Sequence, residues 1–250
     1  MFRLDGKIAL VTGAATGIGQ AIAVALAASG ADIAIADRNA ESLADTESLV
    51  VAQGRRVFKT MIDVRIIEQI EWGVPEIEKH FGPIDILVNN AGINRPAPAD
   101  RATVEEWDDH FNTNVRGGFF LAQAVASGMR TRGWGRIIFI SSQSGLVGIP
   151  GQPIYCATKG AVIQLVRTLG LEWAKDGVTV NSIAPTFVET NLTRQRLSDP
   201  AFRSFVIGKI PKGTLAEPGQ IGAAAVYLAS EEAAMVNCET HRVDGGWTAW

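Results

Sequence analysis

Residues 8–19 read IALVTGAATGIG, and this stretch decides the fold class. A short apolar run, which predicts a strand over 8–11, is followed at once by Gly13, Gly17 and Gly19 and then by a helical pattern. Glycines permit a tight turn and a close backbone approach, and a helix N-terminus offers free N–H groups to phosphates. The stretch is therefore either a pyrophosphate-binding turn, which its position after the first strand favours, or an ordinary strand-to-helix turn.

Short apolar runs alternate with longer helical patterns along the whole chain. Strands that are apolar on both faces are buried on both faces, and helices between them make right-handed crossovers. The pattern predicts an α/β fold, with a doubly wound parallel sheet and helices on both faces. Strands are expected at 8–11, 32–36, 56–59, 84–88, 136–140, 178–183 and 240–243, and helices at 17–29, 40–53, 66–80, 104–131, 154–175 and 218–229.

No shift in composition marks a domain boundary, so residues 1–250 are expected to form one dinucleotide-binding domain. The least regular segment lies at about 184–211. It is too long for an ordinary connection, and such segments are often lids or binding loops. We therefore expect it to contact the substrate.

The composition points to a globular protein without a nucleic-acid or membrane partner. The net charge of −3 gives no attraction to nucleic acid or to an anionic membrane. Cys156 and Cys238 make neither a disulfide framework nor a metal-ligand pattern, so no metal is expected. Residues 1–7 lack the apolar core of a signal peptide, and the apolar stretch 18–36 is interrupted by polar residues. These features favour a cytoplasmic protein.

Asp37 ends the second predicted strand, which is where a dinucleotide-binding fold places a ribose contact. Its carboxylate can accept hydrogen bonds from the adenosine ribose and repel a 2′-phosphate, which favours NAD over NADP. Arg38 follows and weakens that preference, whereas the neutral Thr16 brings no cation to the glycine turn. Asp63 and Val64 follow the third strand, where they are expected to lie beside the adenine ring. A turn-forming role for either aspartate is the alternative.

Six motifs occurring in order resemble the short-chain dehydrogenases/reductases over essentially the whole chain. They are TGAATGIG (12–19), NNAG (89–92), Asn114 within NTNV, ISS (140–142), YCATK (155–159) and VDGG (243–246). The resemblance implies a Rossmann-type sheet of about seven parallel strands, a homotetramer, and hydride transfer between a nicotinamide cofactor and a secondary alcohol or ketone. It further implies that Asn89 stabilises the sheet beside the cofactor and that Thr190 reaches the nicotinamide carboxamide. The candidate cofactor-binding residues are Gly13, Thr16, Gly17, Ile18, Gly19, Asp37, Arg38, Asp63, Val64, Asn90, Ala91, Gly92, Tyr155, Lys159, Pro185, Thr186, Val188 and Thr190.

Tyr155 and Lys159 are one helical turn apart, so a helix places them on one face. A free phenol has a pKa of about 10, and lowering it by two to three units takes about 3–4 kcal/mol. One cation about 4 Å away supplies roughly that much at an effective dielectric of about 20. We therefore predict Tyr155 as the general acid/base, with its pKa lowered by Lys159, and Ser142 as the donor to the reacting oxygen.

The resemblance adds two roles to this set: Lys159 holds the nicotinamide ribose, and Asn114 supports a water that relays protons. Each residue also has an ordinary structural interpretation. Tyrosine and lysine at this spacing are frequent on helix surfaces, and a serine after a strand is a routine N-cap. Because the glycine turn is also present in the chain, the catalytic interpretation of these residues is favoured over the structural one.

Substrate specificity is expected from Asn94, Gln143, Ser144, Gln152 and the Thr186–Leu192 segment, which includes Thr186 itself. Hydrogen-bonding groups suit a hydroxylated ligand, because a buried amide or hydroxyl left unpaired costs about 1–3 kcal/mol. The same residues can instead be polar loop residues that face water. The ending VDGGWTAW resembles sugar- and polyol-oxidising members of the family.

The chain departs from the family pattern at two places. Pro185-Thr186 stands where the family usually has Pro-Gly, and Asn237-Cys238 stands where it usually has Thr-Gly. The first change alters the backbone beside the nicotinamide and brings a hydroxyl towards the pocket. The second puts the local turn geometry in question.

Two other functions compete with an NAD-dependent polyol or sugar dehydrogenase. A 3-oxoacyl-thioester reductase that uses NADPH requires a basic surface for its acyl carrier, and Asp37 and Thr16 argue against it. A non-catalytic dinucleotide sensor can dispense with the tyrosine or the lysine, whereas here the full Asn-Ser-Tyr-Lys set is present.

Overall fold

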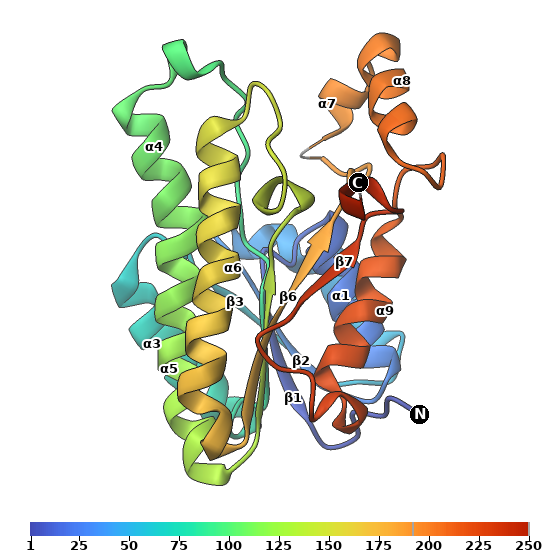
Figure 1. The fold of residues 1–250 in the computed structure, drawn as a ribbon. Helices are drawn as coiled ribbons and strands as arrows, with labels where there is room; N and C mark the ends of the chain where they lie inside the picture. The colour runs from blue at the N-terminus through green and yellow to red at the C-terminus, as the bar shows by residue number, and fades with distance from the viewer. Residues whose placement is uncertain (192, 250) are drawn as a thin grey trace.

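Seven parallel strands form one sheet in the described part of the chain, residues 1–191 and 193–249 of a computed structural model (Figure 1). Their order is β3-β2-β1-β4-β5-β6-β7, which confirms the predicted fold class. Their bounds are β1 Ile8–Thr12, β2 Asp32–Asp37, β3 Val57–Met61, β4 Ile86–Asn89, β5 Gly135–Ile140, β6 Val178–Pro185 and β7 Thr240–Val243.

Helices cover both faces of this sheet because both faces are apolar. One layer contains α1 (Gly17–Ala28), α2 (Ala44–Val51) and α9 (Pro218–Ala229). The other contains α3 (Ile67–Phe81), α4 (Val104–Phe111), α5 (Gly117–Arg132) and α6 (Pro153–Trp173). Within the described residues, no helix combines the length and the apolar character needed to cross a bilayer.

The strand order changes direction beside β1, whose neighbours are β2 and β4. The connections that leave the carboxyl ends of β1 and β4 therefore diverge, and they leave a crevice between them. Asn90 is the first residue after β4, and its side-chain amide bridges to the end of β1 by donating to the carbonyls of Thr12 and Gly13 at 3.0 Å each. The two loops are thereby held together at the crevice.

The helix predicted over 104–131 differs from the structure in one respect. The turn Asn112–Arg116 between α4 and α5 is a π-helix, which inserts one wider turn. Such turns are frequent at functional sites. This turn contains Asn114, whose side chain is buried, with 5 % of the residue exposed.

The segment 184–211 is more regular than predicted. It contains α7 (Arg194–Leu197) and α8 (Pro200–Lys209). Asp199 caps α8 by accepting a hydrogen bond from the N–H of Ala201, and Pro200 occupies the first helical position. These are ordinary start signals of a helix. Both helices lie beyond the carboxyl ends of the strands (Figure 1).

Candidate active site

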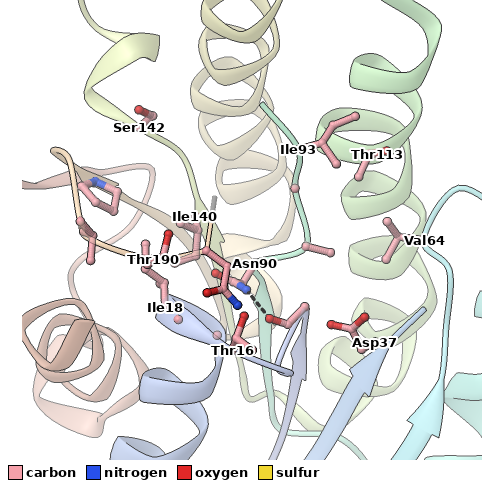
Figure 2. A pocket seen from close by; sticks show the side chains of 18 of the residues that line it. Thr16, Ile18, Asp37, Val64, Asn90, Ile93, Thr113, Ile140, Ser142 and Thr190 are labelled. Carbon is pink, nitrogen blue, oxygen red and sulfur yellow. Dashed lines mark hydrogen bonds between the residues drawn. The ribbon is translucent and has the colours of Figure 1, made fainter. Parts of the chain in front are cut away.

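A pocket of about 350 Å³ opens at the crevice between β1 and β4. All of the residues predicted to bind the cofactor line it, as does Ser142. Figure 2 shows Asp37 at one end of the pocket and Ser142 at the other, with Asn90 and Thr190 between them. The elongated arrangement suits a dinucleotide, with its adenosine end near Asp37 and its nicotinamide end near Ser142.

The glycine turn leaves room for phosphates at the start of α1. Thr16 is the N-cap residue, and in the described chain its side chain makes no capping hydrogen bond, so the first N–H groups of the helix stay free for a ligand. Gly19 is packed so closely that a Cβ there would overlap the carbonyl oxygen of Gly13. The residues therefore fit a pyrophosphate.

Two aspartates mark the adenosine end of the pocket, in different states. The carboxylate of Asp63 is bound by Arg65, with a guanidinium nitrogen 2.7 Å away, and this hydrogen bonding lowers the pKa of Asp63. Asp37 makes no ion pair with any described residue, including its neighbour Arg38. Asp37 is therefore the carboxylate available to ribose hydroxyls.

Tyr155 and Lys159 lie on the first turns of α6 and reach the other end of the pocket. The Lys159 ammonium is 5.6 Å from the centre of the Tyr155 ring and donates to the carbonyl of Ile140 at 2.7 Å. Ser142 Oγ accepts from the N–H of Ser144 at 3.1 Å, so its own hydrogen is available for donation to Tyr155 or to a ligand. The three side chains come from adjacent elements and face one cavity.

The acid/base prediction needs a correction for the protein without a bound cofactor. Burial raises the pKa of Tyr155 to about 12, although hydrogen bonding from Ser142 opposes this. Burial also lowers the pKa of Lys159 to about 8. We predicted that Lys159 lowers the pKa of the phenol, but desolvation of the phenolate dominates, and the ammonium is engaged by a backbone carbonyl. Tyr155 is thus a neutral phenol at pH 7.

Asn114 lies behind Lys159 rather than in the pocket wall. Its amide donates to the carbonyl of Ile93 at 2.9 Å and to Thr158 Oγ1 at 3.1 Å, and it accepts from the N–H of Ile93 at 2.8 Å. A cavity of about 10 Å³ touches both Asn114 and Lys159, comparable with the smallest space that holds one water, about 10–15 Å³. The predicted water-relay role therefore remains a prediction that this geometry accommodates.

The predicted substrate residues fall into two groups. Thr186 lines the pocket, is 7 % exposed, and has no hydrogen-bond partner for its hydroxyl among the described residues. Asn94, Gln143, Ser144 and Gln152 are outside the pocket lining. Gln143 and Ser144 follow Ser142, Gln152 precedes Tyr155, and Asn94 lies in the loop after β4, from which it donates to Gln152. Leu192, at the end of the predicted substrate segment, lies outside the described residues.

The predictions omitted several residues of the pocket wall. Each lies within two positions of a predicted residue or faces the site from the α4–α5 region. Their nearness in sequence to residues at the ends of strands is the signal that could have identified them. They are Ile62, Arg65, Ile93, Arg95, Thr113, Ile140, Ser141 and Thr193. Arg65 and Arg95 both approach Asp109, at 3.6 and 2.6 Å, which no local motif indicates.

The replacement of the usual Thr-Gly by Asn237-Cys238 leaves a left-handed turn in place. Cys238 has a φ of +62°, a conformation that favours glycine. Asn237 secures the turn, because its side chain accepts from the N–H of Val180 at 2.9 Å and donates to the carbonyl of Gly170 at 2.9 Å. The substitution lies away from the pocket.

The chain is similar to known proteins over nearly its whole length. Residues 13–248 match the family described as Enoyl-(Acyl carrier protein) reductase. Gluconate 5-dehydrogenase of Gluconobacter oxydans is 40 % identical over 99 % of this chain and 97 % of its own length. D-threitol dehydrogenase of Mycolicibacterium smegmatis is 42 % identical over 99 % and 95 %. The 3-oxoacyl-[acyl-carrier-protein] reductase of Escherichia coli is 41 % identical over 97 % of both.

A solved structure shares the fold closely. The gluconate 5-dehydrogenase of Burkholderia cenocepacia, in complex with NADP and tartrate, is 40 % identical and superposes with a TM-score of 0.96 over 100 % of this chain and 98 % of that one.

Proposed function

Because the chain belongs to the short-chain dehydrogenase/reductase family, we propose that it interconverts a secondary hydroxyl and a ketone of a polyol or sugar-type substrate. Family membership makes it an oxidoreductase that acts on CH–OH groups with a nicotinamide cofactor. The choice of substrate and the roles of the individual residues are the proposal.

In this proposal the proton moves through Tyr155. As a neutral phenol it donates to the carbonyl oxygen during reduction, and as a phenolate it accepts the hydroxyl proton during oxidation. Ser142 donates its free hydroxyl hydrogen to the same oxygen, where negative charge develops. Lys159 orients the nicotinamide ribose. The bound cofactor carries the hydride, and its oxidised ring adds a positive charge that favours the phenolate.

The observation that carries the substrate proposal is a set of buried amides beside Ser142 and Tyr155. Gln143 and Gln152 are 1 % and 3 % exposed, and Asn94 donates to Gln152 Oε1 at 3.1 Å. Among the described residues, Asn94 Oδ1, Gln152 Nε2 and both amide atoms of Gln143 have no hydrogen-bond partner. Each such atom costs about 1–3 kcal/mol if it stays unpaired. The hydroxyl of Thr186, which lines the pocket itself, is unpaired within the described chain as well. Several hydroxyl groups on a substrate that extends from the pocket past Thr186 towards Gln152 would satisfy donors and acceptors of this kind together.

Sequence identity does not separate this proposal from 3-oxoacyl-thioester reduction, because relatives of both kinds are 40–42 % identical. The unpaired amides and the unpaired hydroxyl of Thr186 favour the polyol or sugar-type substrate. An acyl chain is apolar beyond its carbonyl and leaves these atoms unpaired. The test is a panel of polyols, sugar acids, apolar secondary alcohols and 3-oxoacyl thioesters, each followed at the nicotinamide absorbance with NAD(H) and NADP(H). Turnover confined to thioesters with NADPH contradicts the proposal.

Replacing Gln152 with leucine is expected to lower kcat/KM for the best polyol about tenfold or more, since it removes groups that pair with a ligand. The same variant should retain its rate with an apolar secondary alcohol, because leucine presents no unpaired group to it. Gln53→Leu, at an exposed position, is the control and should leave both rates unchanged. An equal loss with both substrates indicates structural damage instead of lost recognition.

We further propose NAD(H) as the preferred cofactor. The unpaired carboxylate of Asp37 supports it, whereas the neighbouring Arg38 and the NADP held by the Burkholderia relative count in the other direction.

Association into a homotetramer completes the proposal. A groove of about 720 Å³ runs between α5 and α6 and is lined by Phe119, Ala126, Leu165 and Leu169 among others. Val104 and Leu171, on the same layer, are 78 % and 74 % exposed. A second copy of the chain is the partner that covers such a surface with matching symmetry. Light scattering should give a tetramer mass, and a monomer mass at micromolar concentration would refute this part.

A further inference from the structure

A small apolar cluster lies apart from the two cores of the sheet, beyond the carboxyl ends of the strands. We call it the rim cluster. It joins three segments: the loop after β5, the segment between β6 and α9, and the turn after β7. Its buried members are Leu197, Val206, Ile210 and Trp247, and Val147, Ile149, Phe187, Phe202 and Leu215 pack against them.

Trp247 connects this cluster to the C-terminal turn. Its side chain is 9 % exposed, and its ring centre lies 5.7 Å from that of Phe187. Phe187 in turn contacts Phe202 of α8 edge-on, at 5.7 Å. Phe187 stands between Thr186 and Val188, which both line the pocket. A change at Trp247 therefore reaches the pocket wall through one intervening ring.

The turn that carries Trp247 is held firmly. The carboxylate of Asp244, 7 % exposed, accepts from the N–H groups of Gly246 at 2.9 Å and Thr248 at 3.0 Å and from the Thr248 hydroxyl. The turn also binds both ends of residues 186–212, which we call the substrate segment. Val243 accepts from the N–H of Thr186 at 3.1 Å, and Gly245 accepts from the N–H of Lys212 at 3.0 Å.

We propose that Trp247 is a positioning residue that fixes the substrate segment against the loop after β5 and so sets the width of the substrate site. Val147 and Ile149 belong to the loop that begins at Ser142 and ends at Gln152, and they pack against the substrate segment in the rim cluster. Asp37 lies at the other end of the pocket, whereas the glycine turn lies between the two ends, with Gly17 beside Thr190. Loss of the indole thus loosens the substrate wall and leaves the adenosine end of the cofactor site intact.

The test compares Trp247→Ala with Trp247→Phe, and Trp72→Ala is the control because Trp72 is 59 % exposed on α3. Trp247→Ala is expected to raise KM for the alcohol about tenfold, with kcat within about threefold and the NADH Kd within about threefold. Trp247→Phe, which keeps a ring against Phe187, should return KM to within about threefold of the wild-type value. A fall in kcat with KM unchanged, or an equal loss of NADH affinity, overturns the proposal.

Two further measurements test the proposal in other ways. The first needs no substrate, and the second does not depend on the folding of Trp247→Ala. With NADH bound, trypsin should cut Trp247→Ala faster at Arg194 and Lys209, which are exposed in the substrate segment, and an unchanged cutting rate counts against the proposal. Phe187→Leu removes the other half of the same contact. If Trp247→Ala does not fold, an unchanged KM in Phe187→Leu overturns the proposal.

Discussion

Tyr155→Phe is expected to lower kcat for alcohol oxidation about a thousandfold or more while the NADH Kd changes less than about threefold. The substitution removes one oxygen and keeps the ring, so the pocket wall stays in place. The lost oxygen is the group that the proposed mechanism uses to move the proton. Stopped-flow measurement of hydride transfer, with fluorescence titration of NADH, separates the two quantities.

The chain supplies a matched control for this variant, because its two tyrosines differ in location. Tyr227 lies on α9, with its ring 5.5 Å from that of Phe2, in the opposite helix layer. Tyr227→Phe should therefore leave kcat unchanged. If Tyr155→Phe kept turnover within tenfold of the wild-type value, Tyr155 could not be the acid/base.

Asp37→Asn is expected to raise the kcat/KM ratio for NADPH over NADH about ten- to a hundredfold. The carboxylate and a ribose 2′-phosphate repel each other, and at about 5 Å this repulsion is worth a few kcal/mol before solvent screening reduces it. The amide keeps the shape of the side chain and removes its charge. Arg38→Ala should move the ratio in the opposite direction, because it deletes the cation beside the same site.

Binding measurements distinguish this effect from a change in catalysis. The Kd values of NADH and NADPH, measured by fluorescence without substrate, should change by the same factors as the kinetic ratio. Asp45→Asn is the control, because Asp45 is an exposed carboxylate on nearby α2. If wild-type protein already prefers NADPH and Asp37→Asn leaves the ratio unchanged, Asp37 does not select the cofactor, and the NAD proposal fails.

The sequence predicts the fold and the pocket well because both follow from where strands end. Every predicted strand is present, with bounds that differ from the prediction by at most two residues. In a parallel sheet the loops after the strands share one edge, so Gly13, Asp37, Asn90 and Ser142 had to lie near one another. Their placement in one pocket is therefore foreseeable, whereas their roles remain predictions.

Other features depended on tertiary contacts that no local pattern encodes. The helix α8 was missed although Asp199 and Pro200 mark its start, because the surrounding segment lacks a long apolar period. In the protein without a bound cofactor the pKa of Tyr155 is raised, against the expectation that Lys159 lowers it. The spacing between Tyr155 and Lys159 predicts that a cation lies near the phenol. Only the structure shows that the phenol is buried and that the Lys159 ammonium donates a hydrogen bond to a backbone carbonyl.

The separate rim cluster has a consequence for how this chain can diverge. The strands that carry the cofactor site are stabilised by the cores of the sheet, whereas part of the wall around the substrate is packed in the separate rim cluster with Trp247 and Phe187. Mutations at these outer positions can therefore accumulate without endangering the scaffold that carries out the chemistry. A lineage built in this way can acquire new substrates by altering one small module and inherit the rest unchanged.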